Sequence, residues 1–175
     1  MPPSHNRIAV VVLVVVAALL AGCGSAGANP LAWVGVFCGG LADVIAGQSQ
    51  AAVAQPTPQR RKDGMIKLAD TTEQAFTNAA HKLVQLGSPD VTGGTKAQVS
   101  AVGFFTAVAA AVGDRRAKLA ALDANDPDFM QKADQLSRPD LGAAAAQVQG
   151  LTTNQQLTAA FSAAPECQRL SAPHQ

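Results

Sequence analysis

Residues 65–86, MIKLADTTEQAFTNAAHKLVQL, have the clearest helical pattern in the sequence. Its apolar and small residues recur at steps of three and four, which aligns them along one face of an α-helix. These residues are Met65, Leu68, Thr72, Ala75, Phe76, Ala79, Leu83 and Leu86. Polar side chains lie mostly off this face, and Gly87-Ser88-Pro89 follows with a glycine and a proline, which typically end a helix. The stretch therefore predicts a long amphipathic helix with one face in a core.

Two more long segments have the same periodicity. The first runs from Leu31 to about Ala54, and its apolar face comprises Val34, Cys38, Leu41 and Ile45. The second is Lys96–Leu122, which Thr95 and Gln98 open with the spacing of a capping box. Its predicted stripe is Val99, Val102, Phe105, Ala109, Val112, Leu119 and Leu122. Between the first segment and Met65, the prolines of Gln55–Gly64 predict a loop.

Shorter helices are expected toward the C-terminus. Asn125-Asp126-Pro127 predicts an N-cap that opens a helix over Asp128–Leu136. Another helix is expected from Pro139 to about Gln149. Thr153 and Gln156 have capping-box spacing before a last helix, which Pro165 is expected to end.

The composition supports helices over strands. The chain is rich in alanine, contains no tyrosine, and shows no alternation of β-branched residues after the first two dozen positions. Alanine has the highest helix propensity and lacks the bulk that strands favour. We therefore expect an all-α fold, roughly a four-helix bundle with short accessory helices. The alanine bias also suggests a high-GC genome, such as that of an actinobacterium.

The N-terminus has the pattern of an export signal. Arg7 precedes the apolar run Ile8–Leu20, and small residues follow it. This run is shorter than the roughly 20 residues that a membrane-spanning helix needs. The end of the run, Leu20-Ala21-Gly22-Cys23, resembles the lipobox of bacterial lipoproteins. The resemblance implies that Cys23 receives diacylglycerol and becomes the new N-terminus; an ordinary cleaved signal and an uncleaved anchor are the alternatives.

This resemblance divides the chain into four parts. Residues 1–22 form the signal peptide, 23–30 the lipidated cysteine with a flexible tether, 31–170 a single helical domain, and 171–175 a frayed tail. Localisation on the outer face of the cell membrane follows, with acyl chains such as palmitate as the membrane contact.

The other two cysteines are expected to form a disulfide. Lipidation of Cys23 leaves Cys38 and Cys167 as an even pair in an exported, oxidising environment. Two free thiols or a redox pair are the alternative, but no Cys-x-x-Cys spacing is present. The bridge would hold together the two ends of the domain.

Charge gives few indications of partners. Loss of Arg7 with the signal leaves 12 basic and 12 acidic side chains, so no global charge favours nucleic acid. Two dense basic groups remain, Arg60-Arg61-Lys62 and Arg115-Arg116 with Lys118. They are expected to be solvated; alternatively, Arg60, Arg61 and Lys62 could contact anionic lipid or wall polymer from their predicted loop.

No residue pattern predicts catalysis, a cofactor or a metal site. Asp123, Asn125, Asp126 and Asp128 resemble a calcium loop only in composition, because Pro127, Asp128 and Asp134 occupy positions that need other residues. These acidic residues are therefore assigned to helix capping. His81 falls on the polar side of its helix and is expected at the surface.

These observations favour a non-catalytic module. The leading expectation is an envelope binding or scaffold domain that contacts another envelope protein or an amphiphile. The alternative is a carrier that holds a lipid or small apolar ligand in a cavity between helices. The volume of any such cavity distinguishes the two.

Overall fold

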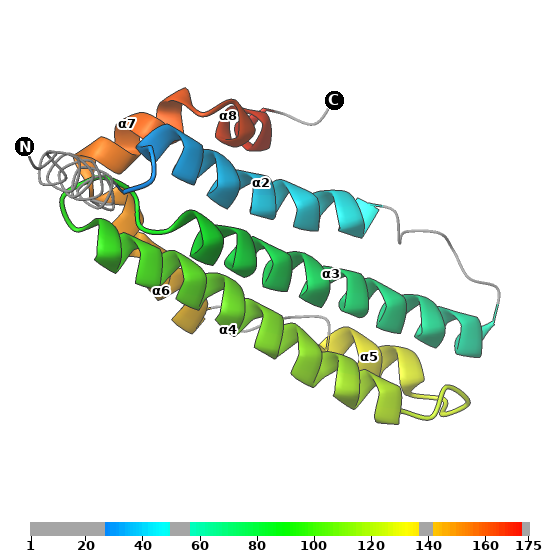
Figure 1. The fold of residues 1–175 in the computed structure, drawn as a ribbon. Coiled ribbons are helices and arrows are strands. Elements are labelled where there is room, and N and C mark those ends of the chain that lie inside the picture. Colours follow the sequence, from blue (N-terminus) through cyan, green and yellow to red (C-terminus); the bar gives the residue numbers. More distant parts are fainter. Residues whose placement is uncertain (1–26, 50–56, 137–141, 173–175) are drawn as a thin grey trace, which may run out of the picture.

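A computed structural model describes residues 27–49, 57–136 and 142–172, which form α-helices joined by short connections (Figure 1). No β-strand occurs among them apart from one isolated bridge between Ala28 and Pro89. The helices are α2 (Pro30–Ser49), α3 (Pro58–Leu86), α4 (Gly94–Ala121), α5 (Phe129–Leu136), α6 (Gly142–Thr152), α7 (Gln155–Ala163) and α8 (Pro165–Ser171). The expected all-α class is confirmed.

The helices form a bundle with accessory helices. The long helices α3 and α4 make an antiparallel hairpin, α2 packs on α3, and α6 packs on α4. Helices α7 and α8 return to cover α2 (Figure 1). Helix α6 thus covers α4, α7 covers α2, and the two short helices contact each other.

An aromatic cluster fills the core beside α2. Phe37 contacts Trp33, Phe104, Phe105 and Phe161, with ring centroids 5.2–6.3 Å apart. Rings from α2, α4 and α7 thus meet at one point, and Phe76 of α3 joins them through Phe104 and Phe105. A smaller apolar cluster of Leu119, Phe129 and Ala133 lies where α5 packs at the far end of the hairpin.

A partly buried polar contact joins three helices and corrects one predicted cap. Gln98 Oε1 accepts a hydrogen bond from Trp33 Nε1 at 2.6 Å, while its amide nitrogen donates to the Leu83 carbonyl at 2.7 Å. Its side chain therefore does not close a capping box with Thr95. Helix α4 instead begins after Gly93, whose positive φ of 75° suits a residue without a Cβ.

Several predicted boundaries are wrong. Thr57 caps α3 through a hydrogen bond from the Arg60 backbone N–H, so Pro58 begins the helix and residues 58–64 are not a loop. Asn154, not Thr153, caps α7, and Pro165 opens α8. Ser171 belongs to α8, whereas residues 50–54 and 173–175 lie outside the described part.

Two residues of the predicted stripes are exposed. The side chain of Ile45 is 45% exposed and that of Val99 is 67% exposed, whereas Val44 is buried. Among the described helices, α4 alone is long and apolar enough to cross a membrane by length and composition. Because it packs between α3 and α6, we assign it to the core of the bundle.

Candidate functional site

The disulfide predicted between Cys38 and Cys167 is present. Its sulfur atoms are 2.06 Å apart and the two Cα atoms are 5.1 Å apart, across 129 positions of sequence. Both cysteines are buried, one in α2 and the other in α8. The bridge therefore joins the first and last described helices, as the sequence predicts.

The segment before α2 is held in place. The Ala28 backbone N–H donates to the Ser88 carbonyl at 2.8 Å, and the Asp90 N–H donates to the Ala28 carbonyl at 2.8 Å. Asn29 caps α2 by accepting from the backbone N–H groups of Leu31 and Ala32. Residues 27–30 therefore belong to the domain, which corrects their assignment to a flexible tether. Cys23 lies outside the described residues.

The end of the bundle at which α2 begins has a second set of loop contacts. Asn154 Nδ2 donates to the Thr92 carbonyl at 2.8 Å, and Gln156 Oε1 accepts from the Thr92 N–H at 3.1 Å. The start of α2, the α3–α4 loop and the start of α7 thus form one hydrogen-bonded surface, defined here as the base.

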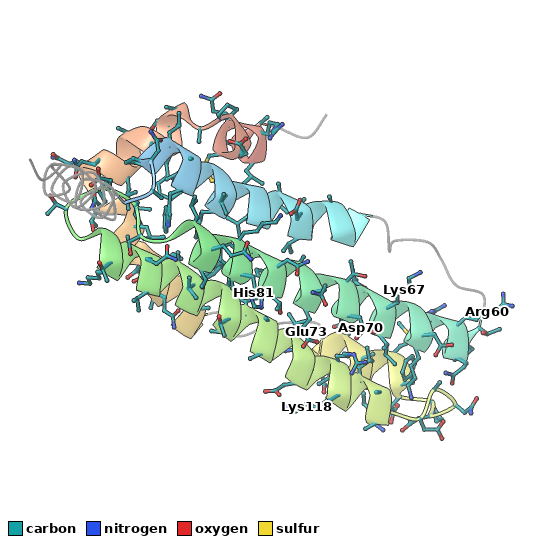
Figure 2. The ribbon with its side chains drawn as sticks, in the orientation of Figure 1. Arg60, Lys67, Asp70, Glu73, His81 and Lys118 are labelled. Atoms are coloured by element: carbon teal, nitrogen blue, oxygen red, sulfur yellow. A yellow bond between two sulfur atoms is a disulfide. The ribbon has the colours of Figure 1, made fainter. Side chains whose placement is uncertain are left out.

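The basic triplet lies at the opposite end (Figure 2). Arg60 and Arg61 are exposed on the first turns of α3. Lys62 Nζ instead donates to the carbonyls of Ala120 at 2.8 Å and Leu122 at 2.5 Å, at the end of α4. The prediction of a loop at these residues is therefore wrong. Lys62 has a structural role that the two arginines lack.

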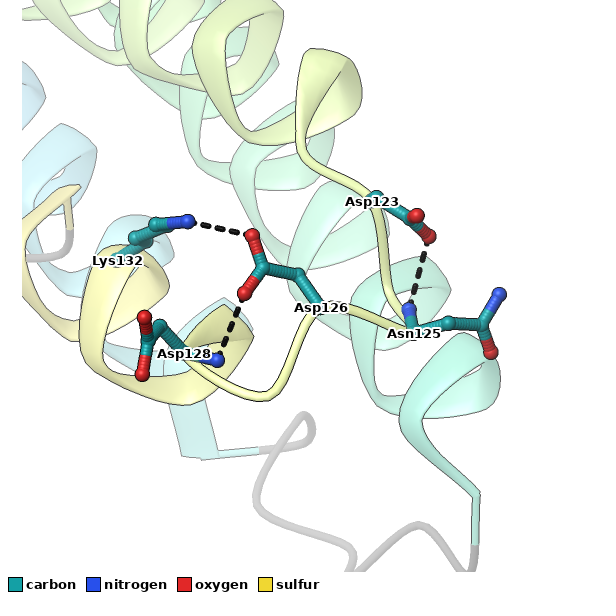
Figure 3. A network of polar contacts seen from close by, with 5 residues as sticks. All are labelled: Asp123, Asn125, Asp126, Asp128 and Lys132. Carbon is teal, nitrogen blue, oxygen red and sulfur yellow. Dashed lines mark hydrogen bonds and ion pairs between the residues drawn. The ribbon is translucent and has the colours of Figure 1, made fainter.

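The acidic turn before α5 is organised by hydrogen bonds within the protein (Figure 3). Asp123 Oδ1 accepts from the Asn125 backbone N–H at 2.9 Å, and Asp126 Oδ1 accepts from the Asp128 N–H at 2.8 Å. Lys132 donates a hydrogen bond to the other carboxylate oxygen of Asp126. This contact, and after it the Asp128 N–H, lowers the pKa of Asp126 below its ordinary value.

An apolar cleft opens beside α5, at the end of the bundle opposite the base. It has a volume of about 210 Å³ and lies between α3, α4 and α5. Met65 and Leu68 of α3, Leu119 of α4 and Leu136 of α5 line it, together with Arg115 and Arg116. Sequence reasoning placed these arginines among the basic groups but missed the cleft, because α5 is needed to form its wall.

His81 is exposed on α3, as expected (Figure 2). No group of three or more His, Cys, Asp or Glu side chains in the described part of the chain could hold a metal ion. Comparison with protein-family models, with curated protein sequences and with solved structures gives no significant match.

Proposed function

We propose that the chain is an exported lipoprotein whose helical domain is a non-catalytic binding or scaffold module on the outer face of the cell membrane. The disulfide carries the proposal. A bond between Cys38 and Cys167 leaves Cys23, the lipobox cysteine, as the remaining thiol of the three. A buried disulfide also fits the oxidising environment outside the cytoplasm.

The base is the part of the domain closest to the proposed lipid. Only residues 24–26 separate Cys23 from Gly27, and an extended chain advances at most about 3.6 Å per residue, so Cys23 lies within roughly 14 Å of Gly27. Helix α3 has 29 residues, which spans roughly 43 Å at 1.5 Å per residue. When the bundle stands on its base, its far end projects about that distance from the membrane.

The packing supports a binding or scaffold module over a carrier that encloses a whole lipid. Rings from α2, α3, α4 and α7 fill the space beside the disulfide, and Phe105 is completely buried among them. Such a core leaves no large internal cavity at this position, so the domain would bind its partners at its surface. Partners of the leading proposal are another envelope protein or an amphiphile.

Substitution of Cys23 by Ala tests the anchor. Diacylglycerol needs a thiol, so the variant is expected to incorporate no labelled palmitate and to leave the detergent phase in a two-phase partition. Cys38→Ser is the matched control, because it removes a cysteine that is bonded in the disulfide and keeps the lipobox. The proposal is wrong if the wild-type protein and the Cys23 variant enter the detergent phase equally and neither incorporates label.

A further inference from the structure

The cleft between α3, α4 and α5 combines apolar walls with cationic side chains. Met65, Leu68, Leu119 and Leu136 provide the walls, and the hydroxyl-bearing Thr72 lies among them. Its volume is about 210 Å³. An apolar cavity of about 150 Å³ is sufficient to bind benzene, so this cleft can accept a short alkyl segment.

The two arginines that line the cleft differ in their contacts. Arg116 donates from Nε to the Asp70 carboxylate in an ion pair. Arg115 is half-buried and forms no ion pair with any side chain of the described residues. Both guanidinium groups line the cleft, and only that of Arg116 is paired with a carboxylate among the described residues, so the charge of Arg115 is available to a ligand beside the apolar surface. A guanidinium group matches a carboxylate because it can donate two parallel hydrogen bonds.

We propose that this cleft binds a single-chain fatty acid, with the first methylenes of the alkyl chain between α3, α4 and α5 and the carboxylate on Arg115. The apolar walls account for the chain, and the uncompensated guanidinium group accounts for the anionic head. This site rests on the proposed binding module and names the class of its amphiphile. It does not require the lipid on Cys23, so it can fail or succeed independently of the proposed anchor.

Calorimetric titration of residues 24–175 with fatty acids tests the proposal. This chain contains every described core residue and both disulfide cysteines, and it lacks Cys23 with its proposed lipid. The probes are hexanoate, octanoate and decanoate below their micelle-forming concentrations. Affinity is expected to increase by about fourfold for each methylene that the cleft buries, and to level off once the cleft is full.

The head group is tested with chains of equal length. Decanoate is expected to bind more tightly than decanol, and decyltrimethylammonium more weakly than either, because only the carboxylate pairs with Arg115. Arg115→Gln is expected to weaken decanoate binding by about tenfold, since a hydrogen bond to a charged group is lost. Lys118→Gln is the matched control: it removes one positive charge from the same helix at an exposed position outside the cleft lining, and binding should remain within twofold.

Filling the cleft tests the chain site. Ala69 lines the cleft and is only half-buried, so Ala69→Leu should fit and should weaken binding of decanoate and decanol alike. Ala69→Phe fills more of the cleft and should weaken binding further, and circular dichroism checks that this variant folds. The proposal is overturned if decanoate shows no saturable binding, if decyltrimethylammonium binds as well as decanoate, or if Arg115→Gln and Lys118→Gln have the same effect.

Discussion

Gly40 allows α2 to approach α3 closely. A Cβ atom at this position would lie 2.5 Å from the Ala79 Cβ and 3.3 Å from the Phe105 ring. These neighbours belong to the packed core, so neither can move away at little cost. Glycine inside a helix normally weakens it, but Gly40 has a packing role that accounts for its presence here.

Gly40→Ala is therefore expected to destabilise the protein. Overpacking of a dense core costs about 1–3 kcal/mol, which exceeds the gain of about 1 kcal/mol from the higher helix propensity of alanine. Urea unfolding should show a lower free energy of unfolding for this variant.

Gly39→Ala is the matched control. No atom lies within 4 Å of a Cβ built on Gly39, so the substitution adds helix propensity without a clash. It should increase the free energy of unfolding by up to about 1 kcal/mol. Equal shifts of the same sign in the two variants would contradict the packing role of Gly40.

At the scale of the element, α3 begins seven residues before the predicted Met65. Thr57 supplies the N-cap and Pro58 occupies the first turn, where proline is tolerated because its missing N–H has no helical acceptor. The prolines on either side of residue 57 indicate that a helix ends or begins there. The local pattern does not show whether the next helix begins at these prolines or several residues later. Arg60 and Arg61 thus project from a helix instead of a loop.

The triplet remains a proposed contact for an anionic surface. Because it lies at the end opposite the base, it would meet wall polymer when the bundle stands on its base, and lipid only when the bundle lies along the membrane. Arg60→Gln with Arg61→Gln should reduce binding of residues 24–175 to anionic vesicles and leave the thermal midpoint nearly unchanged. Binding should decrease with salt, as the Debye length shortens from about 10 Å at 0.1 M to about 3 Å at 1 M.

Lys62→Gln is expected to behave differently from the arginine variants. Loss of its hydrogen bonds to the α4 carbonyls should cost about 1 kcal/mol of stability. Lys96→Gln, at the base, controls for the loss of one charge. If the domain binds anionic vesicles no more tightly than neutral vesicles at low salt, the triplet is not a contact for an anionic surface.

The long helices were predictable from sequence because their periodicity extends over many turns and needs no knowledge of partners. The role of Gln98 was not predictable, because its hydrogen-bond partners, Trp33 and the Leu83 carbonyl, belong to two other helices. Ile45 satisfies the spacing of a buried residue, yet α2 packs through Val44 and Gly40. The cleft likewise depends on the placement of α5, which no local pattern encodes.

At the scale of the whole molecule, two connections fix the ends of the fold. The disulfide joins α2 to α8, and the backbone contacts of Ala28 join the start of the domain to the α3–α4 loop. The disulfide pairing was predictable from the number of cysteines, whereas the Ala28 contacts were not, because Gly27–Pro30 contains only small residues and turn formers.

Removal of the disulfide should destabilise the entire bundle. The bridge closes a loop of 129 positions, and loss of a native disulfide typically costs about 2–5 kcal/mol. Cys38→Ser with Cys167→Ser should therefore lower the urea midpoint, and reduced wild-type protein should unfold at the same midpoint as this double variant. An unchanged midpoint in both cases would show that the helical core does not need the bridge.

One assignment covers the three cysteines: Cys23 is proposed to carry a lipid, whereas Cys38 and Cys167 are bonded to each other. Mass spectrometry of peptides from unreduced protein, extracted from the membranes of the producing cells, tests it most directly. We expect an N-terminal peptide that begins at Cys23 and bears the mass of diacylglycerol, together with a linked pair of peptides containing Cys38 and Cys167. A mature N-terminus without lipid, or a protein that retains residues 1–22, would rule out the proposed anchor.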